Sequence, residues 1–181
     1  MYGIVNKAIK NLVTTNFGQE VWEKVLEKSG VEVDFFISNE PYDDAITYKL
    51  ATAISEELDM PLSDVLYTLG EWWVLKTGKE RYGGLMESGG ANLKEFLVHL
   101  PGFHDRVMMI YPNLTPPEFK VSDITENSIN VHYHSTREGL KDFTRRILNG
   151  LGKMYNTEVE VKEVQSRDEG ATHEIYNVSW E

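Results

Sequence analysis

The sequence contains no cysteine among its 181 residues. This absence excludes disulfide bonds, thiolate-bound metals and cysteine nucleophiles, and it suits a protein of a reducing compartment. No apolar run reaches the length of a membrane span, and the chain does not open on a basic segment followed by an apolar stretch. We therefore expect a soluble, cytoplasmic protein with no membrane insertion.

Basic residues are also scarce, because 18 lysines and arginines stand against 29 aspartates and glutamates, for a formal net charge of −11. A field of this sign repels phosphate backbones, so we do not expect nucleic acid as a partner. Hydrophobic residues make up 41% of the chain, which is enough for a sizeable core. The length suits a single domain, 1–181, that can divide into two packed lobes.

Apolar residues recur at helical spacing through the first part of the chain. The pattern predicts four helices, and glycine or proline marks one boundary of each. The first two helices end at Gly18 and Gly30, and the next two begin after Pro41 and at Pro61. We read Asp43 and Asp44 as solvated charge at a helix face.

The middle of the sequence is rich in glycine, and we predict a loop over 82–90. Asn92 followed by Glu95 has the spacing of a helix N-cap and its reciprocal partner. The helix that they open is predicted to run to about Tyr111 and to bend at Pro101.

After Pro116 and Pro117 the apolar residues recur with a period of two, which is typical of strands. This region predicts a four-stranded antiparallel sheet with one inserted helix over about 140–154. The fold class is therefore α+β. We expect a helical N-terminal lobe over about 1–60 and a second lobe over about 61–181 that contains the sheet.

His104 is the most informative of the five histidines. It shares the apolar face of the predicted fifth helix, where a neutral imidazole is costly unless both ring nitrogens find partners. A haem would supply an iron atom for one nitrogen and a large apolar disc to fill the surrounding pocket. A core histidine bonded to a backbone carbonyl explains the same pattern, and it is the more common case.

Tyr133, Ser135 and Arg137 alternate along one predicted strand, so their side chains share a face. Two hydroxyl groups and a guanidinium suit one or two carboxylates held close together. An ordinary strand end explains this pattern equally well. His132 and His134 point to the other face of the strand and could bind a metal, although a third ligand is not evident.

In combination these residues resemble the haem–nitric oxide/oxygen binding (H-NOX) family, and the likeness covers essentially the whole chain. The opening segment 1–8 and Trp22-Glu23 resemble cyanobacterial members and the beta subunit of soluble guanylate cyclase. The remaining motifs of the resemblance are His104-Asp105-Arg106-Val107, Pro116-Pro117 and Tyr133-x-Ser135-x-Arg137.

The resemblance implies a b-type haem (heme b) between the two lobes, with His104 as the iron ligand. Tyr133, Ser135 and Arg137 would bind the haem propionates. Pro117 would press on the porphyrin and distort it.

The resemblance also places Phe143 where members that hold oxygen stably carry a tyrosine. Val5, Trp73 and Ile147 are its expected neighbours in the distal pocket. Bound oxygen gains roughly 1–3 kcal/mol from a hydrogen-bond donor, whereas bound nitric oxide is less polar and gains little. A pocket without a donor therefore favours nitric oxide over oxygen, although the indole N–H of Trp73 is a candidate donor.

The function implied by the resemblance is that of a sensor of nitric oxide and CO, not an enzyme. When the gas binds ferrous iron, the bond to His104 is released and the lobes shift between two states. The signal passes to a partner protein, which in relatives is a histidine kinase, a cyclic-di-GMP enzyme or a cyclase.

Other functions also fit the sequence. The same fold could serve as a stable oxygen-binding sensor, or the chain could be a haem-free interaction module with a structural His104. A haem enzyme is less compatible with the sequence, because we find no polar acid–base groups placed for peroxidase chemistry. The absorption spectrum of the reduced protein, with and without nitric oxide, separates these possibilities.

Overall fold

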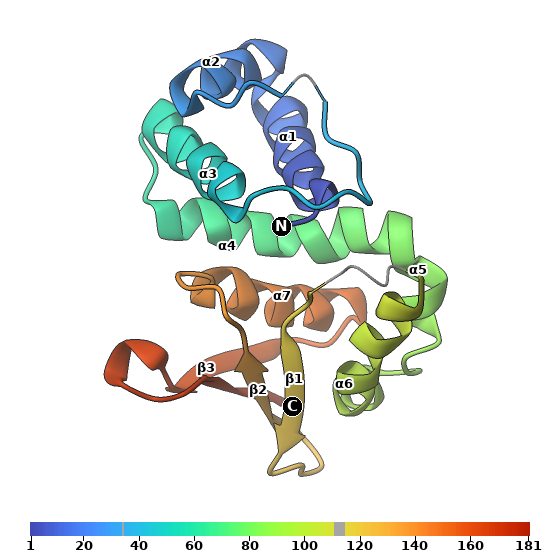
Figure 1. Ribbon diagram of the computed structural model, residues 1–181. Helices are drawn as coiled ribbons and strands as arrows, with labels where there is room; N and C mark the ends of the chain where they lie inside the picture. The colour runs from blue at the N-terminus through green and yellow to red at the C-terminus, as the bar shows by residue number, and fades with distance from the viewer. Residues whose placement is uncertain (34, 111–114) are drawn as a thin grey trace.

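The computed structural model describes residues 1–33, 35–110 and 115–181, and it confirms the α+β class. Helices fill the N-terminal part of the chain. Figure 1 shows α1, α2 and α3 on one side of α4, and α7 with the sheet on the other side. The first helices are α1 (Gly3–Phe17), α2 (Gln19–Ser29), α3 (Asp44–Leu58) and α4 (Leu62–Trp72).

The boundaries of these helices follow from local chemistry. Those at Gly30 and Pro61 are as predicted, whereas the sequence analysis did not predict the cap at Asp43. Gly30 ends α2 in the left-handed region at φ 61°, a conformation that costs a glycine little. The Asp43 side chain accepts a hydrogen bond of 2.9 Å from the Ala45 N–H and so caps α3. Pro61 immediately precedes α4.

The chain does not leave the helical conformation after α4. A π-helix, Trp73–Gly78, follows directly and leads into α5 (Lys79–Glu87). The predicted loop over 82–90 is therefore wrong for most of its length, although Tyr82 has a locally non-helical backbone. Glycine content is a weak guide here because packing overrides propensity, and the side chain of Met86 is buried in the core.

Helix α6 (Leu93–Ile110) begins as predicted. Asn92 Oδ1 accepts a hydrogen bond of 2.9 Å from the Glu95 N–H, and the Glu95 carboxylate accepts one of 2.9 Å from the Ala91 N–H. The helix continues through Pro101. Its predicted end near Tyr111 lies outside the described residues.

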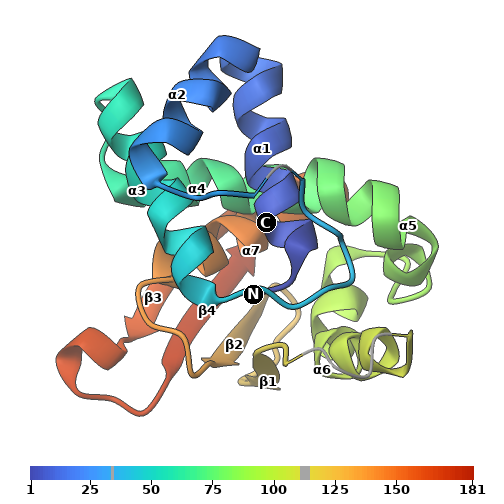
Figure 2. The ribbon, with the colours of Figure 1, turned by 45° about the horizontal axis from the view of Figure 1, so that its top comes forward.

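Within the described ranges, four strands form one antiparallel sheet in the order β1-β2-β4-β3. Helix α7 (Lys141–Met154) connects β2 to β3, and α6 packs beside β1, as both views of the ribbon show (Figures 1 and 2). Along β2 the residues facing the core are buried and alternate with half-buried ones. The strands are β1 (Glu118–Ser122), β2 (Ser128–His134), β3 (Val159–Gln165) and β4 (Glu174–Trp180).

The hydrophobic core is divided along α4 and the π-helix. One cluster, the N-terminal cluster, joins apolar side chains of α1 to α4 and includes Ile9, Trp22 and Leu69. Another, the sheet cluster, joins the sheet with α6, α7 and the π-helix. Trp73 packs against both. Helix α4 therefore contributes side chains to the N-terminal cluster, although it lies after residue 60, where the sequence analysis ends the helical lobe. The lobe boundary near residue 60 stays a prediction.

No helix in the described ranges 1–33, 35–110 and 115–181 is long and apolar enough to cross a membrane.

We predict that Gly70→Ala destabilises the protein, because α4 and α7 meet at this glycine. A Cβ atom there would lie 2.4 Å from the Phe143 carbonyl oxygen, and the two helices would have to move apart. Overpacking of this kind costs about 1–3 kcal/mol of unfolding free energy, measurable by urea denaturation. Gly83→Ala is the matched control, because a Cβ atom added at Gly83 has no neighbour within 4 Å. This substitution should leave the unfolding free energy unchanged or slightly raised. Equal effects of the two substitutions would contradict the packing argument.

Candidate haem site

An apolar cavity of about 230 Å³ lies between the helical layer and the sheet. Its walls come from the N-terminal helices, the π-helix, α5, α6, α7, β1 and β2. The cavity brings together eight of the nine residues that the sequence singles out for the site. These are Val5, Trp73, His104, Pro117, Tyr133, Arg137, Phe143 and Ile147.

A cavity of this size is unusual in a protein core, where voids larger than one water molecule are few. Apolar side chains that line such a cavity are unfavourable when they face water. The cavity is therefore suited to a large apolar ligand that is oriented by a few polar groups.

His104 is the polar group best placed for a metal. Its Nδ1 atom is buried and has no hydrogen-bond partner among the residues that the structure describes. The ring stacks on Phe119 at 5.3 Å between centroids, with Phe103 edge-on at 5.7 Å.

Burial lowers the pKa of His104 from 6.5 to about 4, while the backbone of Pro117 and the charge of Asp105 act in the opposite direction. The imidazole is thus neutral near pH 7, which is the form that binds a metal.

Arg137 lies at the cavity, on the connection between β2 and α7. Its Nε donates to Asp44 Oδ2 at 2.8 Å, and its Nη1 donates to the Thr115 carbonyl at 3.1 Å. Asp44 also forms an ion pair with the amino group of Met1. The interpretation of Asp44 as solvated charge is therefore wrong, because it links α3 to the strand end through Arg137.

Ser135 has a different position from the one that the sequence suggests. Ser135 is not one of the described residues that line the cavity. Its Oγ accepts a hydrogen bond of 3.1 Å from the Arg137 N–H and so fixes the turn that carries Arg137. Tyr133 is only 3% exposed, and its ring contacts Phe119 at 5.5 Å between centroids.

Arg167, which the sequence analysis missed, holds the same turn from a distant segment. Its Nη1 donates to the Ser135 carbonyl at 2.7 Å and its Nη2 to the Arg137 carbonyl at 2.9 Å. Glu174 anchors the guanidinium through Nε at 2.7 Å. Nothing local in the sequence marks Arg167, because its partners lie about 30 residues earlier in the chain.

The remaining four predicted residues on the cavity wall are largely apolar. Val5 comes from α1, Trp73 from the start of the π-helix, and Phe143 and Ile147 from α7. A π-helix is rare and occurs frequently at functional sites.

Two hydroxyl groups of lining residues are hydrogen-bonded to protein. Thr47 Oγ1 donates to Asn6 at 2.6 Å, and Tyr48 OH donates to the Glu138 carbonyl at 2.8 Å. These two donors are thus already used by neighbouring protein groups.

The fold and the cavity define a domain with an apolar cavity between a helical layer and a sheet. The family model described as Haem-NO-binding matches residues 2–163. The chain therefore belongs to this H-NOX family of haem-based gas-sensor domains, which is a sensor and not a catalytic family.

Known proteins similar to this chain agree with that assignment. The soluble guanylate cyclases gcy-32 and gcy-34 of Caenorhabditis elegans are each 27% identical over 177 residues, covering 96% of this chain. The chain spans 26% of the length of each of these curated relatives.

Two solved structures share the fold. An H-NOX protein from S. oneidensis in the Fe(II)NO state aligns with a TM-score of 0.91 and 19% identity, covering 100% of this chain and 99% of that one. The H-NOX protein from K. algicida, in the unliganded Fe(II) state, aligns with a TM-score of 0.86 and 24% identity. That alignment covers 100% of this chain and 97% of the other.

We predict that Asp44→Asn weakens the fold in a pH-dependent way. Burial tends to raise the pKa of Asp44, but hydrogen bonds from the Met1 amino group and Arg137 outweigh it, so the pKa lies below 3.8. A lowered pKa stabilises the folded state above about pH 3.8, and this contribution is lost as the pH falls through the folded pKa. The side chain is 38% exposed, so solvent limits the effect at pH 7 to about 0.5–1 kcal/mol.

Urea denaturation from pH 7 down to pH values below the lowered pKa of Asp44 in the folded state measures this difference. The difference between Asp44→Asn and the parent protein should disappear at the acidic end. Glu126→Gln is the control, since Glu126 is an exposed carboxylate in the turn between β1 and β2. A constant difference across the pH range would show that the ion pair is not its origin.

Proposed function

We propose that this chain binds heme b in the cavity, with His104 as the iron ligand, and that it senses nitric oxide and CO. Family membership supports a haem-based gas sensor. The observation that carries the assignment of the ligand is His104 itself, a neutral imidazole on the cavity wall with a buried nitrogen that lacks a partner among the described residues. Ferrous haem supplies an iron atom that coordinates a histidine on one side and a diatomic gas on the other.

The remaining wall residues suit the parts of a haem. Tyr133 and Arg137 would bind the propionates at the strand end, because a guanidinium and a hydroxyl complement carboxylates. Ser135 and Arg167 would keep the turn of Arg137 in place through the hydrogen bonds described above. Pro117, half-buried on the cavity wall, would press on the porphyrin beside His104.

The proposed gas site is the part of the wall formed by Val5, Trp73, Phe143 and Ile147. Val5, Phe143 and Ile147 offer no hydrogen-bond donor, and the hydroxyls of Thr47 and Tyr48 already donate elsewhere. We expect the indole N–H of Trp73 to bond to backbone and not to the gas. Such surroundings disfavour oxygen, which gains most from a donor, relative to nitric oxide and CO. The discrimination is roughly 10- to 100-fold for each missing hydrogen bond.

Signalling would start at α6, the helix that carries His104. Release of His104 from the iron would free α6 to move beside β1, while the Asp44–Arg137 pair links the helical layer to the sheet. Two discrete arrangements of these layers would be read by a partner protein. We propose a cyclase, a histidine kinase or a cyclic-di-GMP enzyme as the partner, and a cytoplasmic location stays part of the prediction.

We predict that His104→Gly abolishes normal haem binding. The purified variant should lose the Soret absorption of the parent protein, and added imidazole should restore it by entering the space of the missing ring. His99→Gly is the matched control on the same helix, since His99 Nδ1 contacts the Gly89 carbonyl at 2.8 Å. A His104→Gly protein with an unchanged Soret band and no need for imidazole would refute the assignment.

We predict that Phe143→Tyr increases oxygen binding. The new hydroxyl would donate to oxygen at the proposed gas site and raise its affinity roughly 10- to 100-fold, with little effect on nitric oxide. Spectra of the reduced protein, recorded in air over time, give the measurement. Phe143→Leu controls for altered packing and should leave oxygen binding weak. If Phe143→Tyr behaves like Phe143→Leu, then residue 143 does not contact the gas.

A further inference from the structure

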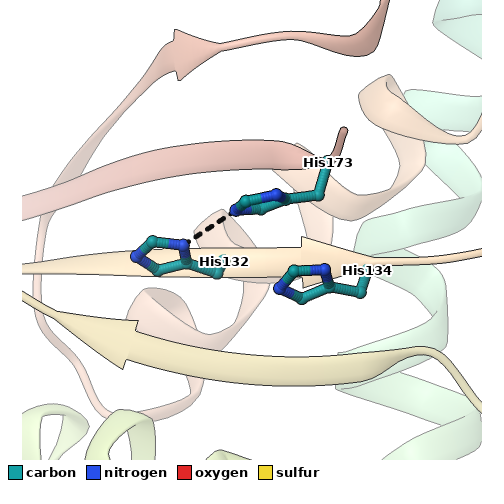
Figure 3. A group of neighbouring side chains, drawn as sticks. All are labelled: His132, His134 and His173. Atoms are coloured by element: carbon teal, nitrogen blue, oxygen red, sulfur yellow. Dashed lines mark hydrogen bonds between the residues drawn. The ribbon is translucent and has the colours of Figure 1, made fainter. Parts of the chain in front are cut away.

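Three histidines gather on the outer face of the sheet. His132 and His134 are alternate residues of β2, and His173 immediately precedes β4. The antiparallel register pairs His132 with Ile175 and Tyr133 with Glu174, so it brings His173 opposite His134. Figure 3 shows the rings side by side, with His132 and His134 on the same strand.

The ring nitrogens of the three histidines lie close together. His132 Nδ1 and His173 Nε2 share a hydrogen bond of 3.0 Å, which a bound metal would replace, and the rings of His134 and His173 stack at 4.0 Å between centroids. One nitrogen from each residue lies within 4.8 Å of the others. All three side chains are half-buried, so they are accessible to an ion from solvent.

The opposite nitrogens of two of these rings are held in place by hydroxyl groups. His132 Nε2 is 2.8 Å from Ser122 Oγ, and His173 Nδ1 is 2.9 Å from Thr172 Oγ1. Metal-binding histidines in proteins almost always have such a partner on the nitrogen that does not bind the metal. The two rings are therefore oriented with their remaining nitrogens facing each other.

We propose that His132, His134 and His173 form a binding site for a divalent transition metal such as Zn²⁺, separate from the haem site. With Zn–N bonds of 2.0–2.1 Å and tetrahedral geometry, ligand nitrogens stand about 3.3 Å apart. The 3.0 Å separation of His132 and His173 is close to this value. Rotation of the His134 side chain brings in the third nitrogen, and a water molecule completes the coordination.

The surrounding charges are compatible with a cation. Asp123 lies next to the cluster and accepts a hydrogen bond of 2.7 Å from Asn130 Nδ2. Lys120 lies opposite His132 in the sheet, but it is paired with Glu118 at 3.1 Å.

Burial and the neighbouring His173 lower the pKa of His132 and His134, so both rings are neutral near pH 7. Imidazole nitrogens match the preference of Zn²⁺, Cu²⁺ and Ni²⁺ for nitrogen ligands.

The position of the cluster separates it from His104. Tyr133, between His132 and His134 in sequence, faces the opposite side of the sheet and lines the cavity. The proposed metal site therefore does not depend on haem, and the two sites can be tested independently.

Equilibrium dialysis of the haem-loaded full chain against zinc chloride, with atomic emission detection, measures zinc uptake. We expect about one bound zinc per chain, with no change in the haem absorption spectrum. Ser122→Ala should weaken zinc binding roughly 10-fold by freeing the His132 ring. His132→Gln, His134→Gln and His173→Gln should each weaken it at least as much, because each removes a ligand.

The control variant is His99→Gln, which keeps the three histidines of the cluster. It should bind zinc like the parent protein, and thermal unfolding verifies that every variant is folded. Zinc uptake that survives in a folded His132→Gln/His134→Gln/His173→Gln triple variant would overturn the proposal. Loss of zinc binding in a folded His99→Gln variant would overturn it as well.

Discussion

The cavity stays open because the apolar side chains on each of its walls pack into the hydrophobic cluster behind that wall. The N-terminal cluster holds one wall, the sheet cluster holds the other, and Trp73 contacts both. Neither wall can move inward without breaking contacts in its own cluster, since interiors are close-packed and resist deformation. The same rigidity keeps His104 at the cavity with one buried nitrogen that lacks a partner in the described part of the chain.

The polar turn that follows β2 is the second element on which the site depends. Ser135 and Arg167 fix its backbone, and Asp44 holds the side chain of Arg137 from α3. Because Asp44 belongs to the helical layer, the proposed propionate contact and the contact between layers share one guanidinium. A carboxylate ligand at Arg137 would therefore compete with, or add to, the link between the two halves of the fold.

The sequence predicted best those features that are determined within a few residues. Helix ends at Gly30 and Pro61 depend on local backbone preferences, and the alternation along β2 depends only on the strand period. The loop over 82–90 was predicted wrongly because the burial of Met86, a tertiary contact, overrides the local signal of the glycines. Asp44 and His173 could not be predicted as neighbours of Arg137 and His132, since only the tertiary fold brings them together.

In the π-helix Trp73–Gly78, the number of residues matters to the packing of the core as much as the identity of their side chains. A π-helix closes its hydrogen bonds between residues i and i+5, whereas an α-helix closes them between i and i+4, so each π-turn holds an extra residue. A change of one residue in Trp73–Gly78 would alter either this hydrogen-bonding pattern or the register at which the following segment, including Met86, packs. Surface loops commonly absorb insertions and deletions. A change of length within Trp73–Gly78 would therefore cost more stability than the same change in a surface loop.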